Sequence, residues 1–95
     1  MTQLDDLIKT AHILRAPGGC PWDAEQTHES LLTYLIEETY ELIDAVQSKD
    51  PEAIKEELGD VLYNVIFHSD IAEANGQFGI QDVAKHMEDK MKSRH

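Results

Sequence analysis

Apolar side chains recur along the chain at the three- and four-residue spacings of an α-helix, in four segments separated by short breaks. No segment alternates apolar and polar positions over the length of a β-strand. The pattern therefore predicts an all-α fold of four helices, expected at about residues 4–14, Thr27–Ser48, Pro51–Asn75 and Gln81–Ser93.

The breaks between these segments carry the residues that end and begin helices. The stretch APGGCPWD, residues 16–23, holds two glycines and two prolines and cannot continue a helix. Asp50 suits an N-cap, and Pro51 suits the first helical position after it. Gly76 suits the stop that ends the third helix. With no internal repeat, residues 1–95 are expected to form a single domain.

The middle of the third helix, LGDVLYNVIF, is apolar almost all round. Such a helix is normally buried on most of its sides. Three short neighbours cannot easily cover it, and a 95-residue domain is marginally stable as a monomer. We therefore expect self-association into a larger helical bundle.

The charge balance narrows the possible ligands. The formal net charge of −11 argues against nucleic acids and anionic membrane surfaces as partners. The N-terminal residues do not resemble a signal peptide, and no apolar run approaches the ~20 residues of a membrane span. The single cysteine excludes an internal disulfide. We expect a soluble, cytoplasmic protein.

Three glutamates in the second helix lack compensating cations. Glu37, Glu38 and Glu41 lie within a turn of one another, and no Lys or Arg occurs between Arg15 and Lys49. At 100° per residue, Glu38 falls nearest the apolar stripe, Glu41 falls at its boundary, and Glu37 faces outward.

The third helix offers a second pair of acids, Glu57 and Asp60, also beside apolar positions. Four converging carboxylates would be prohibitively costly to bury without a cation. Oxygen ligands favour Mg²⁺, with Mn²⁺ as a possible substitute. No thiolate or histidine set indicates zinc, and a di-iron bundle would need Glu-x-x-His motifs from two helices. The alternative is that these acids are solvated helix residues.

The last helix places Lys90 and Arg94 on or beside its apolar stripe. Such residues could meet the oxygens of a polyphosphate held by the metal ion. They could instead only favour the negative end of the helix dipole.

Together these residues resemble the MazG nucleoside triphosphate pyrophosphohydrolases. The resemblance rests on the motif EETYE, followed after fifteen residues by ELGD. The stretch CPWDAEQTH precedes this motif and DKMKSRH follows it, and the resemblance covers roughly residues 12–95. Many members of this family carry two such domains in tandem, and this sequence contains one.

The resemblance implies an all-α, four-helix domain that forms a homodimer or a dimer of dimers, with a bundle shared between subunits. It implies Mg²⁺-dependent hydrolysis of a (d)NTP between the α and β phosphates, and a role in cleaning the nucleotide pool. It assigns metal binding to four acids and phosphate contacts to two bases: Glu38, Glu41, Glu57, Asp60, Lys90 and Arg94.

Other roles stay open. Glu37 could orient the attacking water or be a solvated residue. Glu38, next to it, is expected to be catalytic as well as a metal ligand. Trp22 could stack on the base, with Gln26 or His28 on the base edge, or could cap the hydrophobic bundle. Asn64 could contact the sugar or a phosphate of the substrate, or be a satisfied buried amide. A non-catalytic module that binds nucleotides or proteins is the alternative function.

Overall fold

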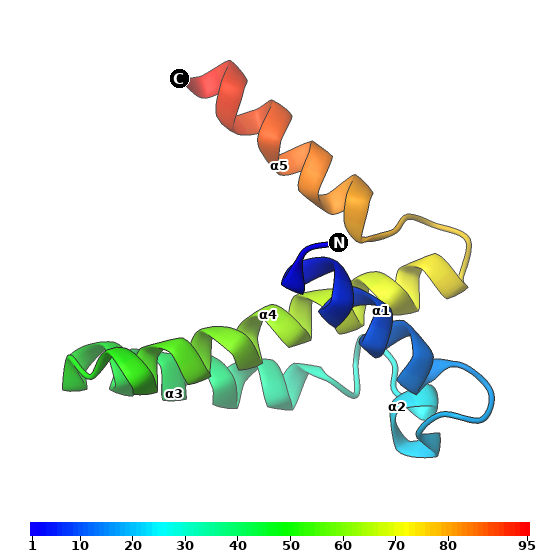
Figure 1. The fold of residues 1–95 in the computed structure, drawn as a ribbon, viewed down its shortest axis with the longest axis horizontal. Helices are drawn as coiled ribbons and strands as arrows, with labels where there is room; N and C mark the ends of the chain where they lie inside the picture. Colours follow the sequence, from blue (N-terminus) through cyan, green and yellow to red (C-terminus); the bar gives the residue numbers. More distant parts are fainter.

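The computed structural model describes residues 1–95 and contains five helices and no strand (Figure 1). The all-α prediction is confirmed. In chain order the helices are α1 (Gln3–Arg15), α2 (Pro21–Glu25), α3 (Leu32–Ser48), α4 (Pro51–Ala74) and α5 (Ile80–Arg94). None of them combines the length and hydropathy of a membrane span.

The expected helix ends of α4 are confirmed. The Asp50 side chain accepts a hydrogen bond of 3.1 Å from the Glu52 amide, and Pro51 begins the helix. After Ala74 the chain turns through Gly76, whose φ of +71° lies in the left-handed region that favours glycine. The prediction of residues 51–75 therefore differs from the observed helix by a single residue.

Two predictions near the second helix were wrong. The prediction missed α2, which Pro21 begins within the stretch that ends α1. The next helix, α3, starts five residues later than expected, because Thr27 and Ser30 bond each other's backbone amides in a turn. Local side-chain hydrogen bonds of this kind compete with the helical ladder.

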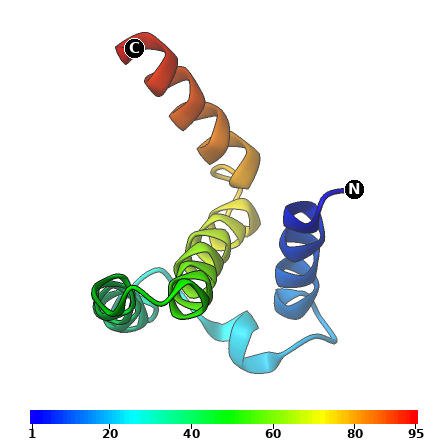
Figure 2. The ribbon, with the colours of Figure 1, turned by 60° about the vertical axis from the view of Figure 1, so that its left-hand side comes forward.

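The helices do not form a four-helix bundle within one chain. The antiparallel pair α3 and α4 lies side by side, and α1 packs against the C-terminal half of α4 (Figures 1 and 2). The last helix, α5, contacts α4 and projects away from the other helices (Figures 1 and 2). The expected bundle is therefore not complete in a single chain.

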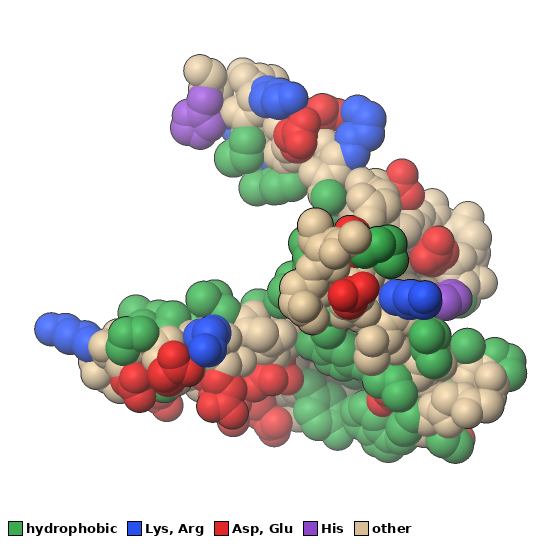
Figure 3. Space-filling model, in the orientation of Figure 1, with side chains coloured by type: hydrophobic (Ala, Val, Ile, Leu, Met, Phe, Trp, Pro, Cys, Tyr) green, Lys and Arg blue, Asp and Glu red, His purple; other side chains and the backbone are tan.

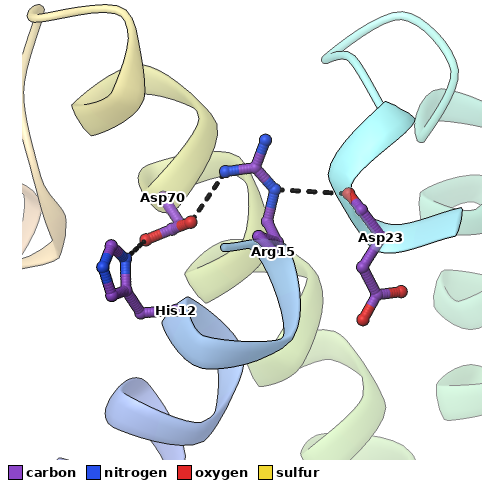
Figure 4. Close-up of polar contacts among 4 residues, drawn as sticks. All are labelled: His12, Arg15, Asp23 and Asp70. Carbon is purple, nitrogen blue, oxygen red and sulfur yellow. Dashed lines mark hydrogen bonds and ion pairs between the residues drawn. The ribbon is translucent and has the colours of Figure 1, made fainter. Parts of the chain in front are cut away.

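A polar contact holds α1 and α2 against α4. Arg15 Nη1 donates a 2.7 Å hydrogen bond to Asp70 Oδ2, and His12 Nδ1 lies 2.8 Å from Asp70 Oδ1 (Figure 4). Arg15 Nε also donates to the backbone oxygen of Asp23, at 3.4 Å. The Arg15 guanidinium lies 5.6 Å above the ring of Phe67. One side chain thus fixes three helices together.

The hydrophobic core is small. Leu31, Phe67 and Ile71 form its centre, and Tyr63 packs against them. The radius of gyration is 14.7 Å, whereas a compact 95-residue domain has about 12.4 Å. The accessible surface is 6934 Å², against roughly 5500 Å² expected for a compact monomer of this mass. The single chain therefore exposes more surface than a finished globular domain.

Candidate metal centre

Acidic side chains gather along one edge of the α3–α4 pair (Figure 3). One carboxylate oxygen from each of Glu41, Glu57 and Asp60 lies within 4.8 Å of the others. Glu41 comes from α3, and the other two come from successive turns of α4. The antiparallel pairing of these helices thus brings together acids that are sixteen or more residues apart in the sequence.

Glu38 lies outside this group of three but near it, because the charges of Asp60 and Glu41 act on its carboxyl group. Its side chain is half-buried, and its Oε2 atom is fully enclosed without a hydrogen-bond partner. Burial raises the pKa of Glu38, and the charges of Asp60, Glu41 and Glu37 raise this pKa further. The prediction that Glu38 is the most buried of the three is confirmed, since Glu37 and Glu41 are both exposed. The predicted difference between Glu37 and Glu41 stays a prediction.

Glu57 is the most perturbed member of the cluster. Its Oε2 atom is also enclosed and unbonded. Burial, together with the neighbouring Glu41 and Asp60, raises the pKa of Glu57 from 4.5 to about 7. Two enclosed carboxylate oxygens without donors are costly for the chain alone. A cation among the four acids would remove that cost.

The donor set therefore fits a hard divalent ion. All four predicted ligands offer carboxylate oxygens, which Mg²⁺ and Mn²⁺ prefer. No histidine or cysteine belongs to the group of close ligand atoms. Glu41, Glu57 and Asp60 are the residues that could hold the ion together. Glu38, the fourth predicted ligand, lies outside this group, and its role as a ligand stays a prediction.

The structure does not bring Lys90 and Arg94 to this cluster within one chain. Both lie in the last turns of α5, and α5 contacts α4 but not α3. Lys90 is half-buried, Arg94 is exposed, and neither forms an ion pair. Their predicted phosphate contacts stay a prediction.

The predicted loop contacts divide into two groups. Trp22 and Asn64 line the same small pocket as Glu38. Gln26 instead donates to the Trp22 backbone oxygen at 3.0 Å and accepts from Ser30.

His28 likewise has a partner within the chain. Its Nδ1 lies 2.8 Å from Nδ1 of His68, with the two rings stacked. Burial and the neighbouring His28 lower the pKa of His68. His28 and Gln26 thus have structural partners, and their substrate contacts stay predictions.

Sequence reasoning assigned no role to Tyr34 and Tyr63, which also line this pocket. Tyr34 lies one turn before Glu38, and Tyr63 lies three residues after Asp60. This helical spacing relative to the acids was the available signal.

Comparison with known proteins gives a consistent result. The sequence model of the MazG nucleotide pyrophosphohydrolase domain matches residues 26–95. The chain is 50% identical, over 96% of its length, to 36% of the nucleoside triphosphate pyrophosphohydrolase/pyrophosphatase MazG of Thermotoga maritima.

Two further relatives carry the name nucleoside triphosphate pyrophosphohydrolase. The Escherichia coli protein is 41% identical over the whole chain and 36% of its own length. The Mycolicibacterium smegmatis protein is 48% identical over 97% of the chain and 28% of its own length. The chain thus spans about a third of the length of these curated relatives.

Proposed function

The chain belongs to the MazG nucleotide pyrophosphohydrolase domain family, and on that premise we propose that it hydrolyses (d)NTPs between the α and β phosphates. The products would be a (d)NMP and pyrophosphate, and the reaction would depend on Mg²⁺, with Mn²⁺ as a substitute. The observation that carries this proposal is the carboxylate cluster, in which two enclosed oxygens have no hydrogen-bond partner. The relatives that bear the name of this activity support it.

In this proposal Glu38, Glu41, Glu57 and Asp60 hold the metal. A bound divalent ion neutralises phosphate oxygens and lowers the pKa of water. Phosphoryl transfer depends mainly on such charge neutralisation and on the alignment of the attacking water. Glu37, exposed beside Glu38, would orient that water. Water attacks the α-phosphorus, the bond to the bridging oxygen breaks, and pyrophosphate leaves.

Lys90 and Arg94 would bind the phosphates that the carboxylates repel. An arginine presents a bidentate fork to phosphate oxygens, and a lysine presents a point charge. Because α5 stands apart from α3 in one chain, these two cations would reach the cluster through a different placement of α5 or from a partner subunit.

We further propose that the protein works as a homodimer or a dimer of dimers. Three α4 side chains at helical spacing, Leu58, Leu62 and Val65, are 52%, 40% and 41% exposed. An apolar face of this kind on an acidic, polar chain marks an association surface. The excess surface of roughly 1400 Å² over a compact monomer exceeds the ~800 Å² that each partner contributes to a standard interface. A cytoplasmic role in nucleotide-pool cleaning belongs to the same proposal.

The proposal is tested by incubating the purified protein with each NTP and dNTP, in Mg²⁺ or in EDTA, and separating the products by anion exchange. Monophosphate and pyrophosphate, formed in Mg²⁺ alone, are the expected products. Diphosphate and orthophosphate would contradict the proposed cleavage site. Nucleotide binding without turnover would favour the alternative, a non-catalytic binding module.

A further inference from the structure

A pocket of about 100 Å³ lies beside the carboxylate cluster, where α2, α3 and α4 meet. Its aromatic wall comes from Trp22, Tyr34, Tyr63 and Phe67, and Glu38 and Asn64 add a carboxylate and an amide. An apolar cavity of ~150 Å³ can hold a benzene ring. This smaller, open pocket can thus accept part of a flat ring but not a whole nucleotide.

Asn64 is the unusual residue of this pocket. It is 6% exposed and lines the pocket, and its amide atoms are not among the fully enclosed polar atoms that lack a partner. A side-chain amide offers two donors and an acceptor, with which the edge of a ligand in the pocket can pair.

The aromatic wall is fixed before any ligand binds. Trp22 meets Tyr34 edge to face at 5.7 Å and Phe67 at 6.5 Å, measured between ring centroids. Contacts of Arg15 with the Asp23 backbone and the Phe67 ring hold α2 in place. Trp22 and Tyr34 still keep 48% and 42% of their surface exposed. Both side chains can therefore contact a further flat ring.

The pocket is continuous with the candidate metal centre. Glu38 lines the pocket and lies near enough to Asp60 and Glu41 for their charges to raise its pKa. Asn64 lies one helical turn after Asp60 on α4. A ligand that places phosphates at the carboxylates would thus carry its base toward Asn64.

We propose that this pocket binds the nucleobase of the substrate and that Asn64 is the specificity residue that hydrogen-bonds the base edge. This inference rests on the proposed function, because the phosphates must lie at the carboxylate cluster. Flat rings with adjacent donors and acceptors match both the aromatic wall and the Asn64 amide.

Trp22 is the only tryptophan of the chain, and its fluorescence therefore reports on this pocket. The protein in Mg²⁺ is titrated with α,β-methylene analogues of the four common NTPs, which cannot be cleaved at that bridge, and with inorganic tripolyphosphate. Calorimetry measures the affinity of the protein for each analogue and for tripolyphosphate. The analogues are expected to change the Trp22 emission and to bind more tightly than tripolyphosphate, which leaves the emission unchanged.

Asn64→Leu keeps the number and branching of the side-chain heavy atoms but removes the amide. It is expected to weaken binding of the preferred analogue about tenfold, the size of one or two lost hydrogen bonds, and to leave tripolyphosphate affinity unchanged. The control is Ser69→Ala, a buried α4 residue that bonds the Val65 carbonyl and does not line the pocket. Circular dichroism checks that both variants fold.

The outcomes separate the two proposals. Unchanged analogue affinity in Asn64→Leu, or analogues that bind no better than tripolyphosphate, would overturn the base pocket while the phosphate site stands. Base-dependent binding that needs Asn64, found in a protein without turnover, would support the pocket and contradict the hydrolytic function.

Discussion

At the scale of single residues, the carboxylates of one cluster differ in their environments. Glu38 and Glu57 each have one carboxylate oxygen that is buried and has no hydrogen-bond partner, whereas the side chains of Glu41 and Asp60 are exposed. The enclosed pair is the costlier half of the cluster when no cation is bound. These two residues should therefore respond most strongly to pH and to divalent ions.

The raised pKa of Glu57 predicts how the metal-free protein responds to pH. Between pH 4.5 and about 7 the folded state binds more protons at Glu57 than the unfolded state does. The free energy of unfolding should therefore fall as the pH rises through this window. Urea unfolding in EDTA at pH 5 and pH 8 measures the fall, and Glu57→Gln should reduce it.

The lowered pKa of His68 acts with the opposite sign, because the unfolded state binds the extra proton just below pH 6.5. The decline in the free energy of unfolding between pH 5 and pH 8 must therefore be compared between the wild type and the variants, because its absolute size also contains the effect of His68. Glu56→Gln, an exposed neighbour, is the control and should keep the wild-type decline. An identical decline in Glu57→Gln would contradict the assignment.

At the scale of helices, the pair α3 and α4 supplies the acids, and the short helix α2 supplies Trp22. Arg15 and Asp70, each with a side chain 10% exposed, join α1 and α2 to α4 (Figure 4). Removal of one partner leaves the other charge buried and unpaired, which is strongly destabilising.

Asp70→Ala is therefore expected to lower the free energy of unfolding by ~3–5 kcal/mol, as measured by urea denaturation. His12→Ala removes the other partner of Asp70, but the His12 side chain is 66% exposed. Its loss should cost at most about 1 kcal/mol. Equal effects of the two substitutions would show that the Arg15–Asp70 pair does not join the helices.

The sequence predicted the long helices well because their signals are local. Thr2 bonds the Asp5 amide at the start of α1, and Asp50 caps α4. The start of α3 was misplaced because the turn at Thr27 and Ser30 depends on side-chain bonds that helical periodicity does not reveal.

The spacing along each helix was enough to predict these acids as metal ligands. Whether acids of α3 lie close to acids of α4 depends on how the two helices pair, which the spacing does not show. The role of Asn64 was left open, because its place in the pocket between α2, α3 and α4 is a property of the folded chain and not of any local pattern.

At the scale of the whole molecule, the chain is open and strongly acidic. The helix α5 projects from the rest, and apolar side chains of α4 remain exposed (Figures 2 and 3). These features agree with the proposal that a second copy of the chain covers the exposed apolar side chains.

Leu62→Glu places a charge on this apolar α4 face, where Leu62 is 40% exposed in the single chain. Burial of an unpaired carboxylate at an interface costs several kcal/mol, and the variant should dissociate to monomers at micromolar concentration. Light scattering after gel filtration measures the mass. Gln47→Glu adds the same charge at an exposed α3 position and should stay associated. A wild-type mass equal to the 10.8 kDa chain would contradict the proposed oligomer.

The central claim is that the carboxylates of α3 and α4 hold the divalent ion used to hydrolyse nucleoside triphosphates. The most direct measurement compares Mg²⁺-dependent pyrophosphate release by the wild type, Glu57→Gln and Glu56→Gln, at one pH and with the fold checked by circular dichroism. The two substitutions remove the same charge from neighbouring residues, of which Glu57 belongs to the cluster and Glu56 does not. We expect a loss of more than about 100-fold for Glu57→Gln and wild-type rates for Glu56→Gln. Full activity in Glu57→Gln, or equal losses in both variants, would contradict the central claim.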